Sequence, residues 1–206
     1  MPNRLRLAAH VTLAVLAVAA AARVDVPVPG SPVPQSLQTL AVVVVGAWLG
    51  ARWGAVALVA YVVAGAAGLP VFADGAAGLG ALLGPTGGYL GGFVLGAAIS
   101  GLVAHRLRVR ARIPVTGAAL GTLFAVAIGA HLVILGLGWA RLSTLLGASE
   151  AFAAGVSPFL WGGVAKSAVA VPLIVMVERL APLHRREGHP EEDEAIRDVH
   201  ELGGEE

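Results

Sequence analysis

The sequence contains one lysine, Lys166, near the middle of a long apolar segment. If that segment crosses a membrane, the ammonium lies about eight residues, or roughly 12 Å, from its outer end. A charge at this depth is costly and usually serves a substrate or an ion. The alternative is a side chain that extends along the apolar surface to reach water. The depth favours a binding role, and we expect Lys166 to bind an anionic substrate.

Other hydrogen-bonding side chains stand at the beginnings or in the middle of apolar segments. Gln38 and Thr39 follow a proline-rich stretch, where polar residues are common at a membrane interface and alone indicate no function. Thr86 and Tyr89 follow a glycine–proline pair, and their hydroxyl groups are expected to face a cavity. His131 lies midway along another apolar segment, where a histidine bonded to a neighbouring group is expected rather than a metal ligand.

The residue types exclude several kinds of chemistry. Cysteine is absent, which removes thiolate catalysis, cysteine metal sites and disulfides. No serine–histidine–acid arrangement, paired carboxylates or second histidine at ligand spacing can be assembled. Residues 162–167 lack the spacing of a phosphate-binding loop. The sequence therefore predicts no enzyme, no metal site and no cofactor in this chain.

The composition places these residues in a membrane. Hydrophobic residues make up 57% of the 206 residues and charged residues 13%, whereas soluble domains are about half apolar and a quarter charged. Lipid is then the outer solvent. The 28 glycines suit helices that pack closely within a bilayer. The predicted fold class is an all-α integral membrane protein.

Six membrane-spanning helices are predicted. The prolines of 24–35 require a loop after the first span, although a cleaved signal peptide is the alternative reading of that span. Leu37–Gly68 would be roughly 48 Å long as one helix, so we divide it at Gly50–Gly54. The predicted spans are Leu5–Ala22, the two halves of Leu37–Gly68, Pro85–Ala104, Val115–Leu137 and Pro158–Leu180, with loops at 69–84 and 139–155 and a basic connector at 105–112.

Charge predicts the orientation. With six spans and a cytoplasmic N-terminus, ten arginines up to residue 186 are cytoplasmic, and only Arg23 and Arg141 lie outside. Five spans would bury Arg52 in the bilayer at a cost of about 3 kcal/mol. Both termini are therefore predicted to be cytoplasmic. Residues 1–182 form the predicted membrane domain, and 183–206 form an acidic tail that is predicted to be disordered.

Small residues recur at helical spacing on two spans. Between Gly84 and Ala104 they recur every four positions, which predicts close packing against a neighbouring helix. Ala8 and Thr12 on the first span are also four residues apart. They predict contact with another helix, either within this chain or in a partner protein.

Four segments together resemble the BioY family of biotin transporters. They are 33–40, 65–72, 84–93 and 155–166, and their order and spacing cover roughly residues 7–182. The resemblance implies a substrate-binding (S) component of an energy-coupling factor (ECF) transporter, with six helices and both termini cytoplasmic. Such proteins capture biotin with high affinity at the cell membrane. A transmembrane coupling subunit and two ATPase subunits then drive uptake, so ATP is hydrolysed in the partners.

The resemblance also implies roles for particular residues. Ala8 and Thr12 match its contact with the coupling subunit. The family pattern has an acid where this chain has Gly163, so Lys166 needs another partner, such as a substrate carboxylate. Trp53 or Trp161 would add apolar walls. The implied substrate-binding residues are Gln38, Thr39, Phe72, Asp74, Thr86, Tyr89 and Lys166.

Three alternatives remain open. The missing acid allows an S component for a different small vitamin or anion. An ion-coupled secondary carrier is disfavoured because intramembrane acids and an inverted repeat are missing. A structural membrane protein that binds nothing small is disfavoured by Lys166 and by the polar clusters beside two loops. We expect the chain to be surrounded by membrane lipid and to bind no nucleic acid.

Overall fold

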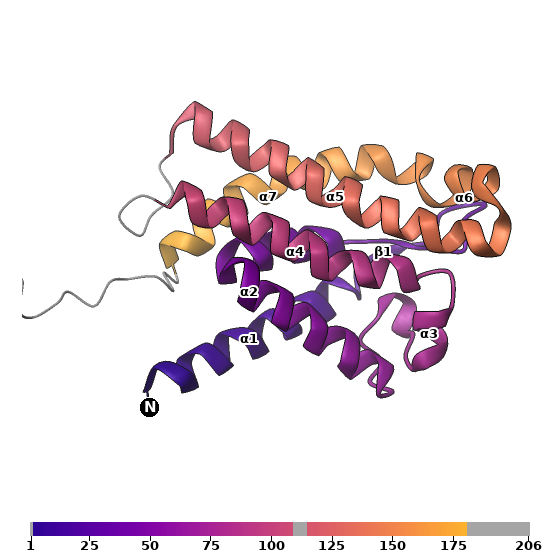
Figure 1. The fold of residues 1–206 in the computed structure, drawn as a ribbon, viewed down its shortest axis with the longest axis horizontal. Helices are drawn as coiled ribbons and strands as arrows, with labels where there is room; N and C mark the ends of the chain where they lie inside the picture. The colour runs from indigo at the N-terminus through magenta and orange to yellow at the C-terminus, as the bar shows by residue number, and fades with distance from the viewer. Residues whose placement is uncertain (1, 109–114, 181–206) are drawn as a thin grey trace, which may run out of the picture.

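The computed structural model describes residues 2–108 and 115–180 (Figure 1). The predicted acidic tail, along with Arg110 and Arg112 of the predicted connector, lies outside the described residues. The elements in chain order are α1 (Pro2–Ala21), β1 (Asp25–Val26), β2 (Gln35–Ser36), α2 (Gln38–Ala66), η1 (Ala73–Gly75), α3 (Leu79–Leu83), α4 (Gly87–Leu107), α5 (Gly117–Leu146), α6 (Ala148–Gly155), η2 (Ser157–Phe159) and α7 (Leu160–Leu180).

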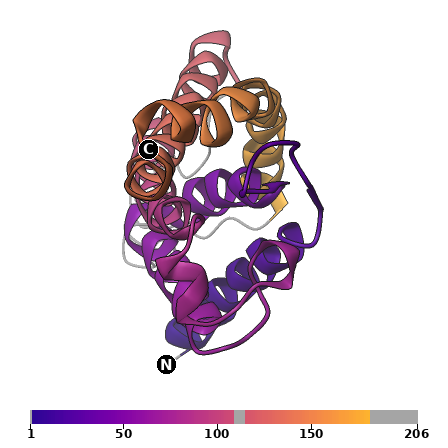
Figure 2. The same ribbon diagram turned by 90° about the vertical axis from the view of Figure 1, so that its right-hand side faces the viewer.

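Within the described residues, five helical stretches are long and apolar enough to cross a membrane: 4–21, 38–66, 87–107, 117–146 and 148–180. The mostly helical, membrane-type fold is therefore confirmed. α4 packs between α2 and α5, and α7 contacts both α2 and α5. The view along the bundle shows α1 at one edge, where it packs on α2 (Figure 2).

α2 reverses its direction at Gly50, whose φ of 81° and ψ of 169° lie outside the helical region. Glycine adopts such angles without the steric cost that a side chain would add. The two halves then lie antiparallel. Gln38 and Tyr61 would be roughly 35 Å apart along one continuous helix, yet their side chains form a hydrogen bond. The predicted break within Gly50–Gly54 is confirmed, and it lies at Gly50 alone.

The two ends of the bundle differ in character (Figure 1). The beginning of α1 and the end of α7 lie at the same end. The opposite end carries β1, α3 and α6. The proline-rich stretch there is a loop, as predicted, with a hydrogen-bonded turn from Val28 to Ser31, and its ends form a short antiparallel pair in which Asp25 faces Ser36. These two-residue strands are a small departure from the predicted all-α fold.

The predicted loop at 139–155 is wrong. α5 continues to Leu146, and α6 follows directly after Gly147, which has a φ of 87°. This stretch contains no proline, and its polar groups find partners: Trp139 Nε1 donates to the Ala148 carbonyl at 3.0 Å, and Arg141 donates to the Leu83 carbonyl. A helix can therefore extend beyond the apolar segment. Residues 69–84 form a loop interrupted by η1 and α3.

The small residues of α4 allow its backbone to approach α5, as predicted. A Cβ added to Gly92 would lie 2.8 Å from Ile134 Cα, which is closer than real contacts allow. Gly96 is nearly as close, with its added Cβ 3.0 Å from Ile134 Cδ1. Gly91, on another face of the same helix, has nothing within 4 Å of an added Cβ. The close α4–α5 contact therefore depends on one glycine face.

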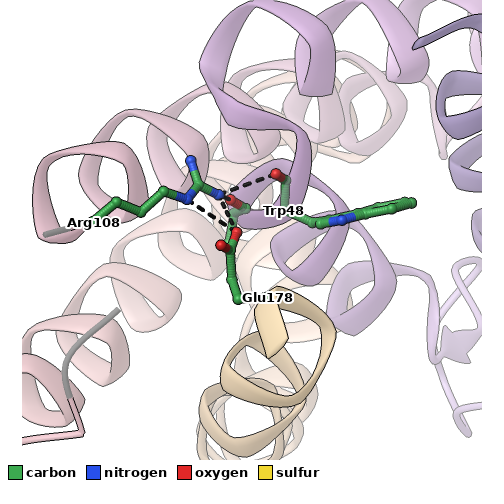
Figure 3. Close-up of polar contacts among 4 residues, drawn as sticks. Trp48, Arg108 and Glu178 are labelled. Atoms are coloured by element: carbon green, nitrogen blue, oxygen red, sulfur yellow. Dashed lines mark hydrogen bonds and ion pairs between the residues drawn. The ribbon is translucent and has the colours of Figure 1, made fainter. Parts of the chain in front are cut away.

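A buried ion pair joins three helices at the end of the bundle where α1 begins and α7 ends (Figures 1 and 3). Arg108, directly after α4, pairs with Glu178 of α7. Its guanidinium also donates to the carbonyls of Ala47 and Trp48, just before the reversal of α2. Both charged side chains are buried, and each is at most 5% exposed. Arg108 thus satisfies carbonyls near the break as well as the carboxylate.

Candidate substrate-binding site

A cavity of about 200 Å³ lies among α2, α4, α5, α7 and the two loops that follow α1 and α2. The resemblance had named seven candidate substrate-binding residues, and the cavity is lined by all of them: Gln38, Thr39, Phe72, Asp74, Thr86, Tyr89 and Lys166. Residues from all four segments of the resemblance meet here, although they are far apart in the sequence.

Lys166 points into the bundle and is half-buried. Its Nζ donates to the Ser36 carbonyl at 2.6 Å and lies 3.4 Å from Thr39 Oγ1. It does not reach the interface along the helix surface. Within the described residues, the ion pair between Arg108 and Glu178 is the only one, so the partners of Lys166 are neutral oxygens. An ammonium has three donors, and a ligand oxygen can take the third.

A buried chain of hydrogen bonds holds Gln38. Ser36 Oγ donates to Gln38 Oε1 at 2.9 Å, and Gln38 Nε2 donates to Tyr61 Oη. The Tyr61 hydroxyl in turn donates to the Val71 carbonyl at 2.8 Å. This chain ties the start of α2 to its second half and to the loop that follows. Gln38 therefore lines the cavity with a fixed amide.

Backbone carbonyls accept hydrogen bonds from two hydroxyl groups at the beginning of α4, those of Thr86, directly before the helix, and Tyr89. Tyr89 Oη donates to the Gly155 carbonyl at 2.7 Å, and Thr86 Oγ1 donates to the Ala81 carbonyl at 3.1 Å. Both side chains line the cavity, as expected. They can offer a ligand the Tyr89 ring and oxygen lone pairs, but their protons are already donated.

The two loops meet beside the cavity. Asp25 Oδ2 accepts the backbone N–H of Asp74 at 2.6 Å, and Arg23 donates to the Pro70 carbonyl. Asp74 has a φ of 55°, a left-handed conformation that aspartate tolerates better than most residues. Asp74 is exposed and lines the cavity, and the buried Phe72 adds an aromatic ring.

Sequence reasoning missed most of the apolar wall and two polar residues, Ser36 and His131. His131 was expected to bond to a neighbour, which it does through Ala127 and Ser167, but it also lines the cavity. Nothing in the sequence distinguished the apolar wall residues from those that face lipid. Neither Trp53 nor Trp161 lines the cavity, and Trp161 is 83% exposed. The missed apolar residues are Pro32, Val33, Pro34, Ala73, Ala76, Leu90, Phe93, Ile134, Leu135 and Phe159.

Ala8 and Thr12 lie away from this cavity, on the exposed face of α1. The buried face of α1 is formed by Ala14 and Val18, which pack into the core. Leu13 and Leu16 are exposed as well. The first helix therefore has an apolar face that nothing in the described part of the chain covers. Among all the residues that the structure describes, no group of three or more histidine, aspartate or glutamate side chains could hold a metal ion.

Apolar helices of membrane-crossing length around a cavity with one ammonium define a multi-pass membrane protein with a site for a small molecule. The model of the BioY family matches residues 1–183, and the chain belongs to this family.

Several named relatives are similar to this chain. A biotin transporter BioY of Thermotoga maritima is 36% identical over 154 residues, covering 74% of this chain and 85% of the relative. A probable biotin transporter BioY of Pyrococcus horikoshii is 34% identical over 149 residues, covering 72% and 81%. The fold also matches the crystal structure of the S-component for biotin from an ECF-type ABC transporter. The TM-score is 0.74 at 21% identity, over 87% of this chain and 92% of that chain.

Proposed function

We propose that this chain is the S component of an ECF-type transporter and that it captures biotin with high affinity for uptake across the cell membrane. One observation carries the proposal. All four segments that resemble the BioY family contribute side chains to a single cavity, in a chain whose named relatives are biotin transporters.

The chemistry of biotin fits the groups in this cavity. Its ureido ring has two N–H donors and a carbonyl acceptor, and its tail ends in a carboxylate. Lys166 can donate to an oxygen, and Asp74 can accept from an N–H. The Phe72 ring suits the apolar part of the molecule. We propose that biotin contacts the seven candidate residues named above.

We further propose six membrane spans with both termini in the cytoplasm. The reversal at Gly50 supports this, because it turns α2 into two antiparallel segments. The beginning of α1 and the end of α7 lie together, as an even number of spans requires (Figure 1). The excess of arginine on that side agrees with the positive-inside rule.

Energy is proposed to come from partners, a transmembrane coupling subunit and two ATPase subunits. We propose no catalysis by this chain, because its sequence lacks a phosphate-binding loop. The exposed face of α1, including Ala8 and Thr12, is the proposed contact with the coupling subunit, because small residues let helices approach closely.

Isothermal titration tests the substrate. The detergent-solubilised protein should bind biotin and desthiobiotin, whereas thiamine and riboflavin should give no heat of binding. Binding of thiamine or riboflavin with no response to biotin would instead identify an S component for another vitamin.

A vesicle experiment tests the source of energy. Reconstituted alone in sealed vesicles, the protein should bind biotin without accumulating it. Uphill accumulation driven by a pH gradient alone would show an ion-coupled carrier and would contradict the dependence on ATPase partners.

A further inference from the structure

His131 is a buried polar residue for which the proposed function has no use so far. It lies on α5, is 5% exposed, and lines the cavity. Its ring lies against Gly163 of α7, where an added Cβ would be 3.7 Å from His131 Cβ and 3.9 Å from Cδ2. These are ordinary contact distances, so the imidazole and Gly163 are direct neighbours where α5 meets α7.

The hydrogen bonds of Nδ1 determine which nitrogen carries the proton. Nδ1 lies 2.8 Å from the Ala127 carbonyl and 3.1 Å from Ser167 Oγ. A carbonyl can only accept, so Nδ1 must carry a hydrogen. In the neutral ring, which predominates for histidine above its ordinary titration range, Nε2 is then an acceptor. The tautomer therefore follows from the Ala127 contact.

Nε2 is buried and has no partner within the described residues. Buried polar atoms nearly always have a partner, so such an atom calls for an explanation. Lys166, a donor on the neighbouring helix, is turned toward Ser36 and Thr39 instead. The hydroxyl protons of Tyr89 and Thr86 also go to backbone carbonyls. Among the residues that the structure describes, no donor thus reaches Nε2, although the ring borders a cavity.

We propose that His131 Nε2 accepts a hydrogen bond from an N–H group of the substrate. This inference rests on the proposed function, because it assigns one more contact within the same cavity. A carboxylate has no proton to donate, so the matching group is a neutral amide or urea N–H, which the ureido ring of biotin supplies. Since Nε2 is covered, the ring or a neighbouring side chain must shift slightly as the N–H approaches. His131 is then a specificity residue that favours substrates with an N–H.

Methylated ligands test this contact directly. Binding of biotin is compared with binding of two analogues, each methylated at one ureido nitrogen, for the parent protein and for His131→Leu. The parent should prefer biotin to one analogue by roughly 5- to 150-fold, the range expected when a buried acceptor is left unpaired. His131→Leu should bind biotin more weakly by a similar factor and should lose most of that preference.

Two further variants separate hydrogen bonding from packing. Ser167→Ala removes a neighbour of the ring but leaves Nε2, so the preference should remain. His131→Gln supplies a carbonyl acceptor and should keep part of the preference, which covers the case in which His131→Leu does not fold. An unchanged preference in His131→Leu, or complete loss of it in a folded His131→Gln, overturns the inference. Failure of the parent to bind biotin at all would instead defeat the proposed function.

Discussion

At the scale of single residues, Lys166 carries its charge among neutral oxygens. The Ser36 carbonyl and the Thr39 hydroxyl satisfy N–H donors, but neither neutralises the positive charge. A charge with neutral partners keeps an electrostatic attraction for a negative or strongly polar ligand atom. The absence of a side chain at Gly163 thus leaves the cavity more positive than an aspartate there would.

Replacing Lys166 should weaken ligand binding strongly. A charge-assisted hydrogen bond contributes on the order of 1.5–3 kcal/mol, so Lys166→Met should reduce biotin affinity by roughly 10- to 150-fold. Lys166→Arg should restore only part of it, because a planar guanidinium does not replace a compact ammonium. Isothermal titration measures both variants. A Lys166→Met protein with the affinity of the parent would show that the ammonium serves packing or coupling.

The sequence predicted the polar part of the site better than its walls. Lys166 could be recognised because a charge within an apolar segment is conspicuous. Leu90 and Ile134 could not, since apolar residues are expected on the lipid-facing and the inward-facing sides of a membrane helix alike. His131 was expected to bond locally, and its place in the cavity wall depends on the rotation of α5, which the sequence does not specify.

At the scale of elements, one face of α4 determines how closely it packs on α5. Gly92→Ala should destabilise the protein by about 1–3 kcal/mol, because its Cβ would overlap the backbone at Ile134. Gly91→Ala is the matched control on the adjacent residue, and it should be neutral or slightly stabilising, because nothing lies within 4 Å. Thermal unfolding in detergent compares them. Equal unfolding temperatures for the two variants would contradict this packing.

Removing one partner of the ion pair between Arg108 and Glu178 should lower the stability of the protein more than removing both partners. Glu178→Leu leaves a buried guanidinium without its carboxylate and should cost about 3–5 kcal/mol of stability. The double variant Arg108→Leu with Glu178→Leu should recover much of this, although the carbonyls of Ala47 and Trp48 lose their donor. Thermal unfolding in detergent again provides the measurement.

Arg52 serves as the control for this pair. It is exposed, with its guanidinium 5.2 Å from the centroid of the Trp53 ring, and Arg52→Ala should cost at most about 1 kcal/mol. A Glu178→Leu protein that unfolds at the temperature of the parent would show that the buried pair contributes nothing. The sequence could not reveal this pair, because its members are 70 positions apart.

At the scale of the whole molecule, the proposed topology predicts which positions face outward. The chain has no cysteine, so single cysteines can be introduced without background. Ala148→Cys should react with a membrane-impermeant thiol reagent in intact cells. Arg52→Cys, beside the reversal of α2, should react only after lysis. Labelling of Arg52→Cys in intact cells would reject six spans with cytoplasmic ends.

Two helix boundaries followed from the sequence because proline or glycine marked them. The loop after α1 and the break at Gly50 were predicted for this reason. The end of α5 was not predicted. An apolar run indicates the part of a helix that lies in lipid, and it gives no information about how far the helix continues beyond the lipid. The α4–α5 contact could be predicted because glycine spacing is directly visible, although the identity of the partner helix was not.

The reversal of α2 also has a consequence for the surrounding lipid. The segment after Gly50 ends at Ala66, so its 16 residues span roughly 24 Å, less than the roughly 30 Å hydrocarbon core. Val56, Val59 and Val63 are exposed along this segment. Acyl chains beside it must therefore compress, at a cost of fractions of a kcal/mol for each ångström of mismatch. A second protein that covered this face would release the compressed lipid, so bilayer elasticity alone would favour association.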